Sequence, residues 1–568
     1  MLAARHRGGH GCFIGMTSPR GSRERRRNLV RARVSVAIAC VLGLLAARAS
    51  PSFAPTPPAL DAAYVIEPEQ PDIRRLGETV AADGTLLAVA APTDGDDALE
   101  PGMVAVHRLS ILKSGKLAVK LEDTLFAPAQ AAGEHFGASL AVLAACREAR
   151  TSGLIAIGVD RATVGEPSPM GVMAGAVDLF ERRPHPEARW RLAARLSASQ
   201  PQPGAEFGAA VAFDRVGSQR LAVGAPRTDV DGAFDSGRVH VFRRASESRG
   251  VTHYDGTSTP TTWHEVAVID PPHPSMSGWF GASVALEGDI LAIGSPGFDV
   301  ALPGSNTAIA NAGAVYIYRR FESSARTFGQ DRTDRRPLER YRLERVLIAP
   351  SPEQSAWFGL AIDLDRGVLA VGTPRARAKS DAAPPVGCVY VFDLAHPTTP
   401  PSRIDPPTTP FGTAPDFETD DDAVQAFGQA LTLRGQTLLV GAPSTDVSEN
   451  GENGENGERD AIRGDPIEDV GAAWIFALDH LRTEARLTPP RLRPSALFGA
   501  SSALTLIAPR DGAPRVCAIV GHLYLEEEST SPSAGAAIYV ADDEAQTFAA
   551  LRWIGASNPA NTPDAAPP

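Results

Sequence analysis

Short apolar runs alternate with turn residues along most of the chain, and this pattern predicts strands rather than long helices. The runs Leu221-Ala222-Val223 and Leu369-Ala370-Val371 are apolar at successive positions, as expected for strands that are buried on both faces. Glu287-Gly288-Asp289 and Asp365-Arg366-Gly367 lie between two such runs and predict tight hairpins. The 52 Gly and 48 Pro residues are spread along the chain, which agrees with a fold that has many turns.

One phrase recurs seven times along the chain. It runs from Phe-Gly through an apolar run and a tight turn to a second run that ends in Gly-Ala-Pro, then through a polar loop to a closing strand that begins with Gly. The fourth copy has Phe280-Gly281, Gly294-Ser295-Pro296 and Gly313-Ala314-Val315. The first glycines of the seven copies are Gly77 (after Leu76), Gly137, Gly208, Gly281, Gly359, Gly428 and Gly499. A further apolar run follows each closing strand, so each copy predicts a four-stranded antiparallel sheet.

A single sheet of this kind cannot cover both of its own faces, whereas seven sheets in a ring can, because each packs on the next. The sequence therefore predicts an all-β fold, a seven-bladed β-propeller of four-stranded antiparallel blades over residues 62–556. The expected blades lie near residues 62–128, 129–199, 200–272, 273–350, 351–407, 408–490 and 491–556. Seven blades leave one strand-like segment surplus, Tyr64–Glu67 or Leu551–Ile554. Either is a candidate to complete the seventh blade beside Ala537–Val540 and so remove an open sheet edge.

The N-terminal segment has the features of an export signal. Several arginines precede an apolar run, Val34–Ala47, and Ala47-Arg48-Ala49 then offers a cleavage site with small residues, so residues 1–49 are expected to be a signal peptide. Arg26-Arg27 leaves open whether export follows the general or the twin-arginine route. Residues 50–61 are expected to be a linker and residues 557–568 a disordered tail.

Charge and cysteine content narrow the function classes. The chain has a formal net charge of −12; residues 1–49 hold ten Arg and one Glu, so the expected mature chain carries −12 − 9 = −21. Such an acidic chain is not expected to bind nucleic acid by general electrostatics, and no transmembrane span is expected after signal removal. Cys388 and Cys517 lie in apolar runs and Cys146 stands apart, so buried free thiols are expected rather than a disulfide framework.

These Phe-Gly and Gly-Ala-Pro phrases resemble the FG-GAP repeat family, whose best-known members form the seven-bladed integrin α propeller. The resemblance covers about residues 62–556 and is closer to the short bacterial form of the repeat. It implies a secreted or cell-surface propeller of the binding or adhesion type, with an extracellular protein or glycan as partner. One departure concerns metal. Integrin-type repeats often carry an Asp-rich calcium loop between the first two strands. This chain mostly has tight turns there, which lack the roughly six to eight oxygen ligands that calcium needs. No cofactor is therefore expected, and calcium is not favoured.

Candidate site residues lie in the connections between strands. Asp229, Asp231 and Asp235 are the nearest approach to a metal-binding loop, although turn chemistry is the favoured explanation for aspartates in such a loop. Trp279 and Trp357 each precede a Phe-Gly pair at one mouth of the ring, where they serve either packing or ligand contact. The candidate partner-binding residues of the long loops are Asp94, Asp96, Asp97, Arg375, Arg377 and Lys379.

The sequence carries no catalytic signature. It lacks His-Glu-x-x-His, a Walker loop and Gly-x-Ser-x-Gly, so a non-catalytic protein is expected. Two alternatives stay open. One is an extracytoplasmic polysaccharide lyase or hydrolase whose site lies at the propeller axis, and the other is a structural component of an envelope or matrix.

Overall fold

The computed structural model divides the chain into two units, Met1–Thr56 and Pro57–Pro568, and every residue that it describes lies in the second unit. The described residues are 59–60, 64–66, 75–92, 102–127, 133–144, 153–164, 172–182, 189–216, 220–245, 263–302, 304, 307–321, 339–377, 385–407, 426–445, 469–479, 481–487, 489, 495–508, 514–522 and 535–541.

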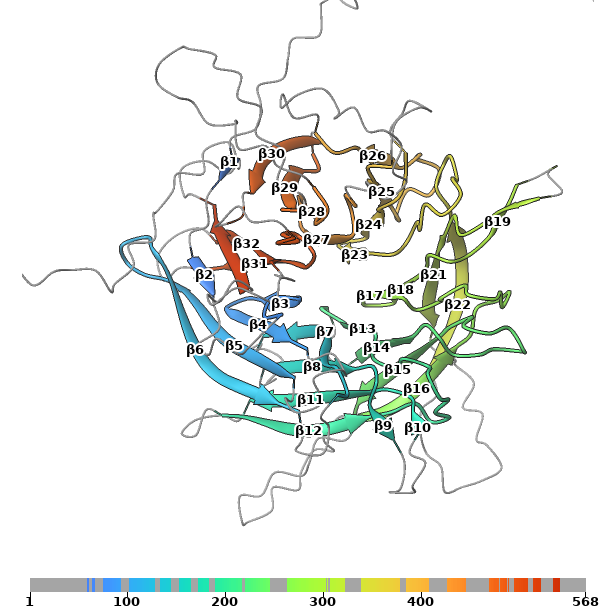
Figure 1. The fold of residues 1–568 in the computed structure, drawn as a ribbon, viewed down its shortest axis with the longest axis horizontal. Coiled ribbons are helices and arrows are strands. Elements are labelled where there is room, and N and C mark those ends of the chain that lie inside the picture. The colour runs from blue at the N-terminus through green and yellow to red at the C-terminus, as the bar shows by residue number, and fades with distance from the viewer. Residues whose placement is uncertain are drawn as a thin grey trace, which may run out of the picture. The chain divides into compact units, whose positions relative to one another are not determined.

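Seven four-stranded antiparallel sheets form a ring, with the first strand of each sheet innermost, so the predicted fold class is confirmed (Figure 1). The first four blades are β3 (Thr79–Asp83), β4 (Leu86–Ala91), β5 (Met103–Ile111), β6 (Leu117–Phe126); β7 (Phe136–Leu143), β8 (Leu154–Val159), β11 (Ala176–Arg182), β12 (Trp190–Leu196); β13 (Ala210–Phe213), β14 (Arg220–Ala225), β15 (Arg238–Arg244), β16 (Trp263–Ile269); and β17 (Ser283–Glu287), β18 (Ile290–Ser295), β21 (Ala314–Phe321), β22 (Arg340–Leu347).

The remaining three blades follow in chain order around the ring. They are β23 (Ile362–Asp365), β24 (Val368–Thr373), β25 (Cys388–Asp393), β26 (Ser402–Ile404); β27 (Ala430–Arg434), β28 (Thr437–Ala442), β29 (Ala472–Ala477), β30 (Arg482–Leu487); and β31 (Ser502–Ile507), β32 (Arg515–His522), β33 (Gly535–Val540) with β2 (Tyr64–Ile66).

The N-terminal segment closes the ring. Strand β2 pairs antiparallel with β33, with Tyr64 opposite Ile538 and Ile66 opposite Ala536. Of the two candidate closing segments, the structure therefore uses the N-terminal one, and it places β2 in the seventh blade although it lies within the range expected for the first. The other candidate, Leu551–Ile554, lies outside the described residues. Strand β1 (Ala59–Leu60) adds a parallel fifth strand to the sixth blade beside β30.

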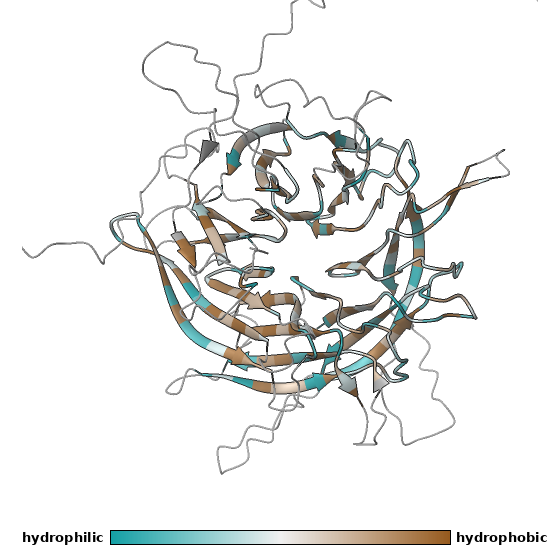
Figure 2. Ribbon diagram, viewed as in Figure 1, coloured by the Kyte–Doolittle hydropathy of each residue, from teal (hydrophilic) through white to brown (hydrophobic). Residues whose placement is uncertain are grey.

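The hydrophobic core is divided into seven clusters, one at each junction between neighbouring blades. The cluster that joins the seventh blade to the first contains Ile66, Leu87 and Ile519, so the ring is closed by packing as well as by strand pairing. Figure 2 shows hydrophobic residues along the inner strands and alternating polar residues on outer strands such as β22. Each blade is thus buried on both faces and solvated at its outer edge.

The recurrent Phe-Gly phrase fits a close approach between blades. Gly237, which begins the closing strand of the third blade, forms a parallel bridge with Phe280 of the fourth, and a Cβ on Gly237 would lie 2.2 Å from the Phe280 carbonyl oxygen. Gly521 of the decayed seventh copy likewise lies beneath the Gly77 carbonyl of the first, 1.9 Å from where its Cβ would be. A Cβ would clash at both glycines. The position of Gly237 is glycine in all seven copies, whereas the position of Gly521 is Ala90 in the first copy.

Opposite faces of the ring carry different connections. The turns between first and second strands are two-residue hairpins in four blades, such as Arg366-Gly367 between β23 and β24. The connections between second and third strands are long, and in the fourth blade this loop contains its own hairpin, β19 (Val300–Ala301) and β20 (Ala308–Ile309). In the second blade, β9 (Thr163–Val164) and β10 (Val172–Met173) do the same. We call these the tight-turn face and the loop face.

Strand is the only regular secondary structure in the described ranges, and no helix there has the length and apolarity to cross a membrane. Cys388 and Cys517 are buried free thiols, as the sequence predicts. Burial raises the pKa of each thiol to about 12, so both stay protonated and act as small apolar side chains.

Candidate functional site

The residue before each Phe-Gly pair adopts the same unusual backbone conformation. Its φ is positive in all seven blades, although none of these residues is glycine, and non-glycine residues rarely adopt this left-handed conformation. Each of these residues lies in the connection from one blade to the next, which emerges on the same face as the long loops. The seven residues at this position, which we call the display positions, are Arg75, His135, Glu206, Trp279, Trp357, Ala426 and Leu497.

In the second and third blades, the display residue pairs with a charged or titratable group of the neighbouring loop. His135 Nδ1 lies 2.9 Å from an oxygen of Asp160, and Glu206 accepts a contact of 2.9 Å from Nε of Arg227. Burial raises the pKa of Glu206 while the Arg227 guanidinium opposes that shift. These two display positions are thus matched within their own blades.

The fourth and fifth blades bring together three of the sequence-predicted residues. The rings of Trp279 and Trp357 meet edge to face, with their centroids 6.4 Å apart and their planes at 73°. The Arg375 guanidinium carbon lies 3.9 Å from the centroid of the Trp357 ring, a distance at which a cation is attracted to the face of an indole. Both tryptophans are half-buried and Arg375 is exposed. We call these three residues the tryptophan–arginine cluster.

The loop that carries Arg375 is held in place by polar contacts. The backbone N–H of Arg377 donates to Oε2 of Glu353 at 2.7 Å. The backbone carbonyl of Arg377 accepts from the Arg403 guanidinium at 2.7 Å, and Asp405 in turn accepts from Nε of Arg403 at 2.6 Å. These bonds fix the approach of the loop, so Arg375 is presented on an ordered backbone.

Two exposed apolar residues adjoin this cluster, and the sequence analysis did not single them out. The side chains of Phe234 and Met276 are 63% and 69% exposed. They are neighbours, because the backbone N–H of Ser277 donates to the Phe234 carbonyl at 2.8 Å, and Trp279 follows in the same segment. The signal that could have revealed the site is the residue before Phe-Gly, which changes chemical type from copy to copy while the phrase around it stays constant.

The aspartates of the third blade's long loop make turn contacts. Val230 and Ala233 bond to each other across a two-residue turn in which Asp231 and Gly232 both have positive φ, as a type I′ hairpin requires. Oδ1 of Asp229 accepts from the backbone N–H of Asp235 at 3.0 Å. In the part of the chain that the structure describes, no group of three or more His, Cys, Asp or Glu residues gathers as a metal site.

The other candidate residues have different outcomes. Arg377 is exposed beside the tryptophan–arginine cluster, where its backbone contacts are those given above. Asp94, Asp96, Asp97 and Lys379 lie outside the described residues.

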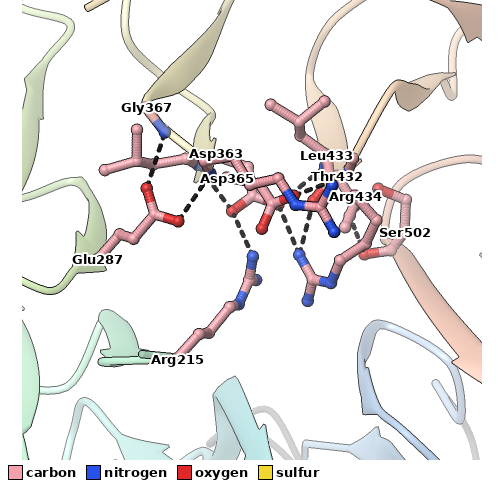
Figure 3. A network of polar contacts seen from close by, with 12 residues as sticks. Arg215, Glu287, Asp363, Asp365, Gly367, Thr432, Leu433, Arg434 and Ser502 are labelled. Carbon is pink, nitrogen blue, oxygen red and sulfur yellow. Dashed lines mark hydrogen bonds and ion pairs between the residues drawn. The ribbon is translucent and has the colours of Figure 1, made fainter. Parts of the chain in front are cut away.

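An ion-pair network spans the axis at the tight-turn face (Figure 3). Arg215 of the third blade lies 3.2 Å from Oδ1 of Asp363 in the fifth blade, and these blades are not neighbours, so the contact crosses the centre of the ring. Arg434 of the sixth blade lies 3.3 Å from the other oxygen of Asp363, which also accepts from the backbone N–H of Leu433 at 2.8 Å. The Asp363 carboxylate is thus shared by two guanidinium groups.

Carboxylates also link neighbouring hairpins on the tight-turn face. Glu287 accepts from the backbone N–H groups of Arg366 at 2.6 Å and Gly367 at 2.9 Å in the next blade. Asp365 then accepts from the Gly435 N–H at 2.6 Å, one blade further on. Asp83 and Asp214 make equivalent bonds to their following blades. These bonds hold the inner hairpin of the first blade to the second blade, and those of the third, fourth and fifth blades each to the next blade.

The fold places the protein among the seven-bladed β-propellers whose blades interlock through Phe-Gly and Gly-Ala-Pro phrases. A family model described as FG-GAP repeat matches residues 190–242, from β12 through most of β15. The chain thus contains an FG-GAP repeat at residues 190–242 within a seven-bladed β-propeller. No curated protein sequence matches it.

Proposed function

We propose that this protein is a non-catalytic, extracytoplasmic binding module that recognises a protein or glycan partner through its loop face. The observation that carries the proposal is the tryptophan–arginine cluster, in which two tryptophans and an exposed cation from different blades meet on one face. Tryptophan and arginine are the residue types that most often dominate binding energy at interfaces. Long loops on a rigid scaffold are also where binding residues concentrate.

One further feature supports a binding role over catalysis at the axis, and another supports a location outside the cytoplasm. The charged side chains described at the tight-turn end of the axis, Arg215, Asp363 and Arg434, are engaged with one another. The expected signal peptide supports action outside the cytoplasm. A role in adhesion follows if the partner lies on another cell or on a matrix.

The experiment compares the two faces within a single blade. Surface proteins and polysaccharides of the organism that encodes the chain are passed over the immobilised protein, and the retained species is identified, purified and titrated. Arg375→Gln on the loop face should weaken its binding, whereas Arg366→Gln in the tight turn of the same blade should leave the affinity unchanged. The proposal fails if nothing is retained with a measurable affinity, or if Arg366→Gln is the more damaging change.

A further inference from the structure

We propose that the tryptophan–arginine cluster, with the adjoining Phe234 and Met276, binds a protein segment in which an apolar side chain lies next to a carboxylate. This inference rests on the proposed function, since it requires a binding role for the loop face. It goes further by naming the sector of that face and the chemistry of the ligand.

The Arg375 guanidinium supplies the positive charge that would meet the carboxylate. At the equivalent place in the third blade, Arg227 pairs with the display residue Glu206. In the fifth blade the display residue is Trp357, and within the described ranges no carboxylate lies at ion-pair distance from the Arg375 guanidinium. Stacking on an indole leaves the donors at the edge of the guanidinium available, and those donors match a carboxylate in two parallel hydrogen bonds. The fifth blade thus offers a positioned cation where the third blade offers a neutralised pair.

Exposed apolar residues beside this cation would meet the apolar side chain of the ligand. Phe234 belongs to the long loop of the third blade, and Met276 to the connection that leads to Trp279. Both residues are more than half exposed. The backbone N–H of Trp279 donates to the carbonyl of Asp235, the residue after Phe234, at 3.1 Å, and the Trp279 ring meets Trp357, over which Arg375 lies. A ligand that covers this strip needs an apolar group next to a negative one.

The residue types favour a protein segment over a sugar. Phe, Trp, Met and Arg are enriched at the centres of protein interfaces, from which Asp, Glu and Lys are depleted. Sugar recognition depends on several polar side chains that converge on hydroxyl groups. The Glu353 carboxylate accepts from the backbone of this loop, at Arg377.

The test selects ligands without assuming a partner. A random dodecapeptide library is panned against the full chain, and enriched peptides are synthesised with their acidic residue intact or replaced by Gln. Affinities are measured for the unaltered protein, for Arg375→Gln, for Trp357→Ala and for the matched control Arg227→Gln. Oligosaccharides of uronic acids are titrated in parallel as the glycan arm.

The expected result is enrichment of Asp or Glu beside Leu, Ile, Met or Phe. Arg375→Gln and the acid-to-Gln peptide should each raise Kd about tenfold, as for loss of a charge-assisted hydrogen bond. Combined, they should raise it little further, because they remove the same contact. Arg227→Gln should change Kd less than about twofold, and added salt should weaken binding only when Arg375 is present.

Three outcomes overturn this inference. They are failure to enrich any peptide, enrichment of peptides whose binding is indifferent to Arg375 and Trp357, and Arg375-dependent binding of uronic acid oligosaccharides instead of peptides. None of them decides the proposed function, which is judged separately by the retained surface partner and by the comparison of Arg375→Gln with Arg366→Gln.

Discussion

The two faces of the ring use charged residues for opposite purposes. On the tight-turn face, Glu287 and Asp365 accept backbone N–H groups from the following blade, and Asp363 joins the third, fifth and sixth blades across the axis. On the loop face, Arg375 is exposed over Trp357. The charges described on the first face link the blades. On the second face, the Arg375 guanidinium has no carboxylate at ion-pair distance within the described ranges and is the group that we propose to meet a ligand.

This difference shows why charge alone is a poor guide to a recognition surface. Glu287 and Asp365 stand in exposed-looking hairpins of the sequence, where they resemble ordinary solvated turn residues. Their oxygens nevertheless satisfy N–H groups of a neighbouring blade. Substitutions there should lower stability rather than binding, and the following predictions separate those two effects.

The largest effect is expected for Asp363→Ala. Removing this carboxylate takes away the anion that Arg215 and Arg434 share. Arg434 is largely buried, and within the described ranges it keeps only the more distant Asp83 and Asp365. The free energy of unfolding should therefore fall by about 3 kcal/mol. Urea unfolding followed by far-UV circular dichroism measures the loss. Asp363→Asn, which keeps an oxygen for the Leu433 N–H, should lose less. An unchanged unfolding midpoint for Asp363→Ala would show that the axial network does not stabilise the ring.

A pH-dependent effect of similar size should come from the interior, away from both faces. Burial lowers the pKa of His107 from 6.5 to about 4, so between these pH values the unfolded chain binds a proton that the folded chain does not. The unfolding free energy should therefore fall as the pH drops from 6.5 to 4, by at most about 3 kcal/mol from this group. His107→Phe should flatten that dependence.

Asp178 provides an internal check on this sign. Burial raises the pKa of Asp178 from 3.8 to about 6, with Arg195 opposing the shift, so the folded chain binds the extra proton. Its contribution should favour folding as the pH falls from 6 to 3.8. Asp178→Asn should therefore make the free energy of unfolding fall more steeply with decreasing pH, whereas His107→Phe should make it fall less steeply. Parallel pH profiles for the two variants would contradict these assignments.

A smaller effect is expected for the links between hairpins. Glu287→Gln weakens two charge-assisted hydrogen bonds to the next blade, and the free energy of unfolding should fall by about 1–2 kcal/mol. Peptide affinity at the loop face should stay the same, because the change lies on the opposite side of the ring. A loss of affinity in a fully folded Glu287→Gln protein would mean that the two faces are coupled.

The smallest effect on stability is expected for Arg375→Gln. An exposed arginine stacked on an indole contributes about 0.5–1 kcal/mol, so the thermal midpoint should move little while ligand affinity falls. Arg366→Gln in the opposite turn, with a side chain that is 78% exposed, should change neither quantity. If Arg375→Gln lowers the free energy of unfolding as much as Asp363→Ala does, Arg375 has a structural role and the distinction between the two faces is wrong.

The fold could be predicted because residues of the repeated phrase contact one another across neighbouring blades. Phe280 and Gly237 meet between blades, and both belong to the phrase that the sequence repeats. Which end closes the ring could not be predicted, since Tyr64–Glu67 and Leu551–Ile554 offer similar strand patterns and the choice depends on pairing with β33.

The candidate site was only partly visible in the sequence. Trp279, Trp357 and Arg375 can be singled out by residue type, yet their meeting depends on the packing of neighbouring blades. The positive φ before each Phe-Gly pair is also hidden, because residues such as Trp and Leu carry no local signal for that conformation. Nor does exposure of Phe234 and Met276 follow from their positions in the chain.

The pairing of β2 with β33 also bears on how the chain reaches its folded state. These strands are separated by almost the whole propeller in sequence, so the contact that completes the last sheet is among the most non-local in the molecule. Contacts of this kind slow folding, because the entropy of closing the intervening chain is lost before the contact stabilises it. Until β33 has been synthesised, the early strand has no partner and the first blade lacks its neighbour. Closure of the ring is therefore a late folding event. After it, the stability of the first blade and that of the seventh depend on each other.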